Sequence, residues 1–192
     1  MNEITIRKVT PDDARRLLEI YSYYVTDTAI SFEYDVPSPA EFRKRIETIS
    51  AFYPYLAAEC GGRIVGYAYA HPFVGRKAYD WSAELTVYVD KDYRRCGAGK
   101  KLYLTLERCL AKMGVTNLYA CIGVPEKDDE YLTRNSLEFH EHMGFKAVGM
   151  FSACGRKFGR WYDMVWAEKI IAEHCGEVKD VVSFNSVKVD LI

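Results

Sequence analysis

The sequence lacks an excess of charge of either sign, and it lacks any long apolar run. Its 26 Lys and Arg residues balance 27 Asp and Glu residues, which leaves a net charge of -1 over 192 residues. This balance argues against a nucleic-acid-binding protein, which usually carries a strongly basic surface. No segment approaches the roughly 20 apolar residues that a membrane-spanning helix needs, and residues 1–10 alternate polar and apolar side chains without a signal-peptide core. We therefore expect a cytoplasmic protein without nucleic-acid or membrane partners.

Paired cysteines are also missing. The six cysteines include no Cys-x-x-Cys pair. Cys60, Cys109 and Cys121 lie in apolar segments, where a thiol packs as a small hydrophobic group. We expect reduced, structural thiols, as in a reducing compartment. Cys96 is the exception because it lies in a Gly-containing loop.

What the sequence does contain is the pattern of a single domain of the α/β (α+β) class, over residues 1–170. Strands are predicted at residues 3–9, 55–60, 63–70, 81–90, 117–123, 145–151 and 161–169. Helices are predicted to begin at residues 10–13, to cover residues 38–50, to end at Gly114 and to cover residues 136–143. This order indicates a mixed sheet with helices packed on it. Residues 171–192 form a C-terminal extension, whose alternating run 181–189 suggests an extra edge strand or a partner contact.

The most informative segment is residues 85–102, where an apolar strand leads into a basic turn that opens directly onto a helix. The start of a helix offers unpaired N–H groups and a partial positive charge. Gly97 and Gly99 let a ligand approach the backbone closely. Formal positive charge surrounds the turn, on Arg94, Arg95, Lys100 and Lys101. Together these features predict a site for a diphosphate group.

Two common phosphate motifs do not fit this turn. A Walker A loop needs Gly and then Ser or Thr at the positions that Arg94 and Lys101 occupy. A dinucleotide fingerprint needs a third Gly where Leu102 stands. The remaining pattern, Arg94-x-x-Gly97-x-Gly99, resembles the acetyl-CoA motif of the GCN5-related N-acetyltransferase (GNAT) superfamily.

The resemblance extends over residues 3–168 and is closest to the phosphinothricin acetyltransferase branch of that superfamily. The similar segments follow in the family's order, at residues 24–33, 78–81, 84–89, 137–141 and 159–163. The resemblance implies the GNAT fold, a mixed and mostly antiparallel sheet flanked by helices and splayed between the cofactor-binding strand and the next strand. It also implies acetyl-CoA as cosubstrate, a small-molecule amine as acceptor, and a homodimer.

The resemblance assigns the cofactor site residue by residue. Val87, Tyr88 and Val89 would contact the pantetheine arm through their backbone groups. The diphosphate would lie on the loop formed by Arg94, Arg95, Cys96, Gly97, Ala98, Gly99 and Lys100. The family has an Asn near the start of the following helix; Thr133 stands at that spacing and Asn135 directly precedes Ser136, and we favour Asn135.

Acetyl transfer to an amine needs a neutral amine, because a protonated amine has no lone pair, and amines with a pKa near 10.4 are almost fully charged at pH 7. Glu84 matches the family glutamate proposed as the general base that removes this proton. His140 matches a family histidine that either donates a proton to the CoA thiolate or shapes the site. No metal site is expected at His140 and His142, because positions i and i+2 of a helix point apart.

Acceptor contacts are expected from two loops. Phe32 and Glu33 lie in the first long loop, and Arg76 and Tyr79 lie before the strand that carries Glu84. Arg76 would bind the carboxylate of an amino-acid-like acceptor. The resemblance implies phosphinothricin, methionine sulfone or methionine sulfoximine. Two alternatives remain open: acetylation of a protein or peptide amine, and a non-catalytic acyl-CoA-binding sensor.

Overall fold

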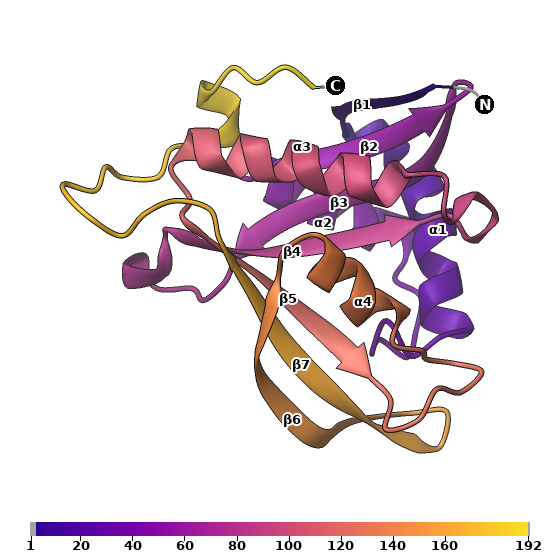
Figure 1. The fold of residues 1–192 in the computed structure, drawn as a ribbon. Coiled ribbons are helices and arrows are strands. Elements are labelled where there is room, and N and C mark those ends of the chain that lie inside the picture. The colour runs from indigo at the N-terminus through magenta and orange to yellow at the C-terminus, as the bar shows by residue number, and fades with distance from the viewer. Residues whose placement is uncertain (1–2, 192) are drawn as a thin grey trace.

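A seven-stranded mixed sheet forms the centre of the molecule in the computed structural model, which describes residues 3–191 (Figure 1). The strand order is β1-β2-β3-β4-β5-β7-β6. The strands are β1 (Ile4–Lys8), β2 (Tyr55–Cys60), β3 (Arg63–Pro72), β4 (Ser82–Val89), β5 (Asn117–Val124), β6 (Lys146–Lys157) and β7 (Arg160–Ile170). Every neighbouring pair within residues 3–191 is antiparallel except β4 and β5. The predicted mixed, mostly antiparallel sheet is confirmed.

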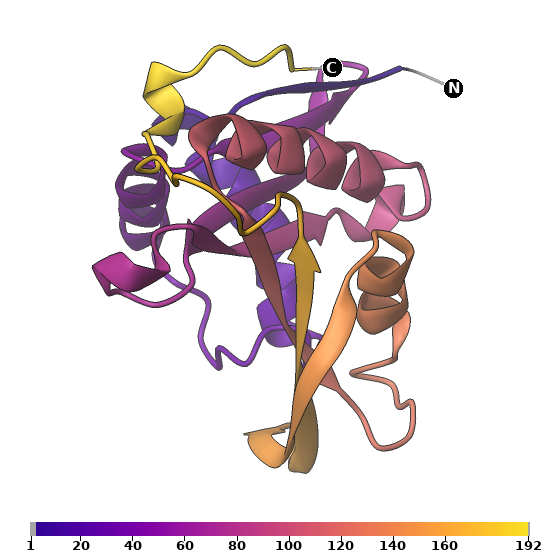
Figure 2. The same cartoon turned by 60° about the vertical axis from the view of Figure 1, so that its left-hand side comes forward.

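Four helices cover the two faces of this sheet. They are α1 (Ala14–Thr26), α2 (Pro39–Ser50), α3 (Ala98–Met113) and α4 (Asn135–His142). α1 and α2 pack against one face of β2 and β3, whereas α3 and α4 lie on the other face (Figures 1 and 2). The predicted start signals act as expected. The Asp13 carboxylate accepts the Thr10 N–H at 2.8 Å in a short 3-10 turn before α1, and the Ser38 hydroxyl accepts the Glu41 N–H at the start of α2.

The sheet is splayed between β4 and β5. The parallel pairing joins only residues 82–84 of β4 to residues 117–119 of β5. β4 continues to Val89 beside β3, while β5 turns away to pair with β7 (Figure 1). One edge of β4 is therefore without a partner strand beyond Glu84 within the described part of the chain. Glu84 itself lies where the two strands separate.

The C-terminal extension is not the extra strand that its alternation suggests. The chain crosses α3 as a strap with a 3-10 turn at Phe184–Ser186 (Figure 1). Phe184 is buried and its N–H donates to Phe52 O at 2.8 Å, while the Val182 N–H donates to Met113 O. The expectation of a strand is wrong. The alternating valines pack against the main core. The backbone of this segment forms hydrogen bonds with the ends of helices and loops and not with the edge of a sheet.

Two further expectations need correction. Cys109 is buried as predicted, but Cys121 is exposed, because it lies on the face of β5 opposite the one that packs in the main core. β3 extends to Pro72, so His71 belongs to this strand, although the strand predicted from the sequence ends at residue 70. No helix within residues 3–191 has the length and apolar character needed to cross a membrane.

Candidate functional site

The unpaired edge of β4 presents backbone groups to the splay. The Asp90 N–H donates to Val65 O of β3 at 2.8 Å. Because hydrogen bonding alternates along an antiparallel pair, Tyr88 turns its backbone groups toward β3, and Val87 and Val89 turn theirs toward the opening. The Tyr24 hydroxyl of α1 already bonds to both backbone groups of Val89. Val87 thus offers an N–H and a C=O to an extended amide chain.

Asp90 holds the loop that follows β4. Its carboxylate accepts the Asp92 N–H at 3.0 Å and forms an ion pair with Arg16 of α1. Burial of Asp90 raises the pKa of its carboxyl group, but the Asp92 N–H and Arg16 outweigh burial and leave the pKa below its usual value. The carboxylate therefore stays ionised, and it fixes the turn that leads to α3.

The start of α3 is suited to an anion. Gly97 has a φ of 90°, in the left-handed region, and no side chain of the described residues caps the helix. The first N–H groups of α3 are therefore available to a ligand. Arg95, Cys96 and Lys100 are exposed around this turn, and Ala98 is buried beneath it.

Two of the predicted cofactor residues need separate description. The Arg94 guanidinium lies over the Tyr23 ring, 5.3 Å from its centroid, and so faces α1. Gly99 lies against α4: a Cβ on Gly99 would be 3.6 Å from the Phe139 ring. The first turn of α3 and the helix α4 therefore lie side by side across the splay.

Glu84 lies at the point where β4 and β5 separate, and His71 is its partner. The two residues are opposite each other in the β3–β4 register, with 3.8 Å between His71 Nε2 and Glu84 Oε2. The Glu84 side chain is only 19% exposed. Burial raises the pKa of Glu84 above its usual value, and the positive charge of a protonated His71 opposes that shift. Sequence reasoning missed His71, although Tyr67, Tyr69 and His71 continue one alternating face of β3.

The face of the sheet that carries Glu84 continues on β5. Tyr119 is opposite Glu84 in the register, and Cys121 and Gly123 follow on the same face. The Phe32 ring lies 3.4 Å from the position that a Cβ on Gly123 would take, so this part of the first long loop closes one end of the face.

The other end of this face is closed by aromatic rings. Phe73 stacks on Tyr119 with 4.1 Å between ring centroids, and Tyr79 contacts Phe73 edge-on at 6.2 Å. Tyr79 and Phe32 therefore flank the same surface, and their contact with an acceptor stays a prediction. Arg76 is exposed in its loop, and the Glu33 carboxylate is already paired with Arg45 of α2 at 2.7 Å.

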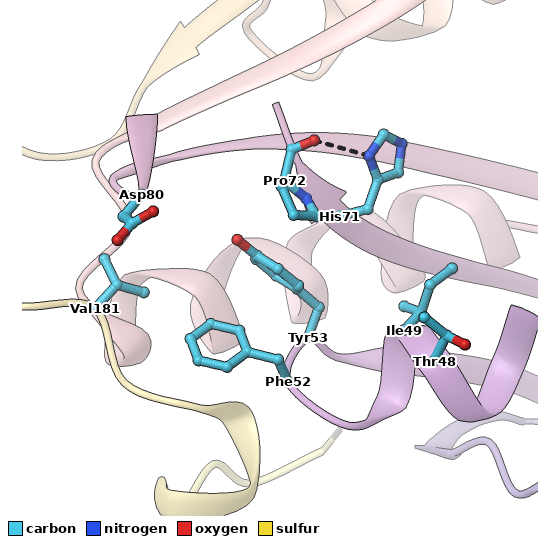
Figure 3. A pocket seen from close by; sticks show the side chains of 8 residues that line it. All are labelled: Thr48, Ile49, Phe52, Tyr53, His71, Pro72, Asp80 and Val181. Carbon is cyan, nitrogen blue, oxygen red and sulfur yellow. Dashed lines mark hydrogen bonds between the residues drawn. The ribbon is translucent and has the colours of Figure 1, made fainter. Parts of the chain in front are cut away.

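A cavity of about 410 Å³ lies beside His71 (Figure 3). The His71 Nδ1–H donates to Pro72 O at 3.0 Å, as the dashed line in Figure 3 shows, so a neutral His71 keeps the lone pair on the nitrogen that faces Glu84. The lining residues come from α2 and the turn after it, from β3, from the loop before β4 and from the C-terminal strap; they include Thr48, Ile49, Phe52, Tyr53, Asp80 and Val181.

His140 lies buried on α4 with both ring nitrogens bonded. Nδ1–H donates to Ser136 O at 2.6 Å, and Nε2 accepts the Tyr103 hydroxyl at 2.7 Å. Burial lowers the pKa of His140, which favours the neutral ring. Asn135 is exposed at the first position of α4, and its N–H donates to the Thr133 hydroxyl.

Comparison with known proteins agrees with this arrangement. The sequence model of a family described as "Acetyltransferase (GNAT) domain" matches residues 6–166. The chain is 34% identical over 161 residues to a phosphinothricin N-acetyltransferase of Streptomyces viridochromogenes, with 84% of each chain covered. It is 36% identical over 166 residues to a phosphinothricin N-acetyltransferase of Alcaligenes faecalis, covering 86% of this chain and 81% of that protein.

A solved structure extends the similarity to three dimensions. A GNAT superfamily phosphinothricin acetyltransferase from Sinorhizobium meliloti, crystallised in complex with acetyl-CoA, superimposes with a TM-score of 0.85. The alignment covers 95% of this chain and 99% of that chain, at 29% sequence identity. The predicted fold, with its splayed sheet, is confirmed by this match.

Proposed function

Since the chain belongs to the GNAT family of N-acetyltransferases, we propose that it transfers the acetyl group of acetyl-CoA to the primary amine of a small amino-acid-like acceptor. The observation that carries this proposal is the unpaired β4 edge from Glu84 to Val89, followed by the loop that leads to the uncapped start of α3. The edge suits an extended amide chain such as pantetheine, and the helix start suits a diphosphate. Coenzyme A carries both groups in that order.

The cofactor is assigned to groups on the β4 edge, in the loop that leads into α3 and at the start of α4. The backbone of Val87 and Val89 faces the pantetheine arm, with the Tyr24 hydroxyl as an intermediary at Val89. The loop from Arg95 to Lys100 receives the diphosphate, while the Tyr88 backbone supports the strand from the β3 side. Arg94, held over the α1 rings, adds positive charge beside the diphosphate without entering the loop. Asn135 at the start of α4 is the assigned polar contact from the other side of the splay.

Glu84 is assigned as the general base. The bound cosubstrate supplies an acetyl thioester, and the protein must supply a neutral amine to attack it. The Glu84 carboxylate, with its raised pKa, lies where the acceptor face meets the splay, and it takes the proton from the incoming ammonium group. His140 is assigned a supporting role, because its buried neutral ring already accepts the Tyr103 hydroxyl.

The acceptor is assigned to the face of β4 and β5 that Phe32 and Tyr79 flank. The relatives named as phosphinothricin N-acetyltransferases support an acceptor that combines an α-amine with a carboxylate; methionine sulfone and methionine sulfoximine have the same groups. Arg76 is an exposed cation in the loop between Phe73 and Tyr79, and its planar guanidinium suits a carboxylate, so it is assigned to the carboxylate of the acceptor. Glu33 is assigned a structural role beside the acceptor face, because Arg45 already neutralises the charge of its carboxylate.

Release of CoA thiol from acetyl-CoA tests the proposal directly. With a panel of amines, we expect turnover with phosphinothricin, methionine sulfone or methionine sulfoximine and little with peptides that lack a free amino-acid carboxylate. Faster turnover with a peptide or protein amine would favour the peptide acetyltransferase. Binding of acetyl-CoA without turnover on every amine would favour the non-catalytic sensor.

A second copy of this chain is the proposed partner of the β6–β7 hairpin. β6 is an edge strand of 12 residues with a largely exposed surface. Met150 is 61% exposed, Phe151 53% and Trp161 62%. Large exposed apolar groups on an edge strand are typical of an interaction surface.

Light scattering after size-exclusion chromatography checks this partner. Wild type is expected to elute at the mass of two chains, and the double variant Phe151→Glu, Trp161→Glu at the mass of one, because buried charge opposes association. Leu104→Glu is the control, since Leu104 is 43% exposed on α3, and this helix lies at the opposite end of the molecule from the β6–β7 hairpin (Figure 1). A double variant that keeps the wild-type mass would exclude the hairpin as the interface.

A further inference from the structure

We propose that His71 is a positioning residue for the general base: its imidazolium, across the β3–β4 register, keeps the Glu84 carboxylate ionised and ready to take the acceptor proton. The inference rests on the proposed function only in taking Glu84 as the base. It concerns a residue just beyond the strand predicted at residues 63–70, which the observed strand register places opposite the Glu84 carboxylate.

The geometry fixes which nitrogen faces the carboxylate. Because Pro72 O can only accept a hydrogen bond, His71 Nδ1 carries a proton in either charge state. The second proton therefore arrives on Nε2, the atom 3.8 Å from Glu84 Oε2. A protonated His71 places its added N–H, and its charge, toward the base.

The other titratable groups around Glu84 cannot supply a positive charge, because phenols and thiols are neutral or anionic, and their raised pKa values keep them neutral near neutral pH. Tyr69 lies on β3, and burial raises its pKa to about 12. Tyr103 on α3 is buried, which raises its pKa well above the usual value. Partial desolvation raises the pKa of Cys121 on β5 to about 11, although part of its side chain is exposed. Within the described chain, His71 is the one group that is both within ion-pair distance of Glu84 and able to become a cation there.

The balance of effects on Glu84 explains why such a partner is useful. Burial favours the protonated carboxyl, which would leave less of the base in its active form as the pH falls. A cation 3.8 Å away favours the carboxylate. His71 thus extends the pH range over which a half-buried base remains able to accept a proton, without filling the acceptor face itself.

The acid limb of the pH profile of kcat/KM tests this role. In His71→Gln, the acid limb is expected to move to higher pH by about one pH unit, because the carboxylate loses its neighbouring cation. The plateau at high pH is expected to stay within about twofold of wild type, since Glu84 is ionised there in both proteins. His71→Lys restores a positive charge and is expected to return the limb to the wild-type position or below.

A spectroscopic measurement separates this inference from the proposed activity. In protein labelled with 13C at Glu carboxyl carbons, the Glu84 resonance is assigned by its loss in Glu84→Gln. Its titration midpoint is expected to rise in His71→Gln, whether or not any amine is acetylated. His142→Gln is the control, because His142 is exposed on α4 and bonds only to its own helix.

The results that would overturn the inference are specific. If the Glu84 resonance titrates at the same pH in wild type and His71→Gln, the ion pair does not act on the base. If His71→Gln lowers kcat/KM equally at every pH with an unmoved acid limb, His71 has only a structural role. If wild type acetylates no amine but the titration midpoint of Glu84 rises in His71→Gln, the effect of His71 on Glu84 is confirmed and the proposed function is wrong.

Discussion

Replacing Glu84 by Gln is expected to lower kcat at pH 7 by about 10²- to 10⁴-fold, the usual contribution of a positioned general base. The amide keeps the size of the side chain but cannot accept a proton from the acceptor ammonium. In the variant the rate should therefore continue to rise with pH, as the fraction of free amine grows in solution. In wild type the rate should level off once Glu84 is ionised, above an acid limb that burial has moved to higher pH than an ordinary glutamate. Steady-state kinetics between pH 5.5 and pH 10, set by the range of these groups, measure both curves.

Two controls make the Glu84 result interpretable. Calorimetry should give the same acetyl-CoA affinity for Glu84→Gln and wild type, because Glu84 does not belong to the loop assigned to the diphosphate. Glu47→Gln, on the exposed surface of α2, should leave the pH profile unchanged. A Glu84→Gln profile that overlays the wild-type curve would show that another group removes the proton.

The elements that the sequence predicted well are those with strong local signals. Gly61 and Gly62 both take left-handed φ values in the β2–β3 turn, which is the reason a Gly-Gly pair predicts a hairpin. Gly114 likewise ends α3 in a left-handed conformation with φ of 97°. The same reasoning failed for residues 181–189, because alternation shows which side chains are buried but not whether a strand edge is available to pair with.

In the candidate site, too, the features with local sequence signals could be predicted, and those that depend on long-range contacts could not. The loop around Gly97 is contiguous in sequence, so its charge, glycines and following helix could be identified together. The His71–Glu84 pair depends on the register of two strands, and the stacking of Phe73 on Tyr119 depends on where a loop folds back. Sequence spacing contains neither of these long-range contacts. The exposure of Cys121 has the same origin, since it depends on which face of β5 packs in the main core.

Replacing Gly97 by Val is expected to weaken acetyl-CoA binding by about 10- to 100-fold, the equivalent of about 1.4–2.8 kcal/mol. Gly97 has a φ of 90°, which a β-branched residue adopts only with strain. The strain is relieved by moving the loop, and that movement turns the first N–H groups of α3 away from the diphosphate. The added side chain also occupies space that the structure leaves open at this position. Calorimetric titration with acetyl-CoA measures the loss.

Gly62→Val is the matched control for the backbone strain. Gly62 also has a left-handed φ, of 77°, and a Cβ there would likewise meet nothing within 4 Å. It lies in the β2–β3 turn, so its substitution imposes a similar strain on the fold without touching the start of α3. Both variants should unfold at lower denaturant concentration than wild type, but only Gly97→Val should lose affinity for acetyl-CoA. If the two variants bind acetyl-CoA with equal affinity, the diphosphate does not lie on this loop, because the strain at Gly97 would then have no effect on the ligand.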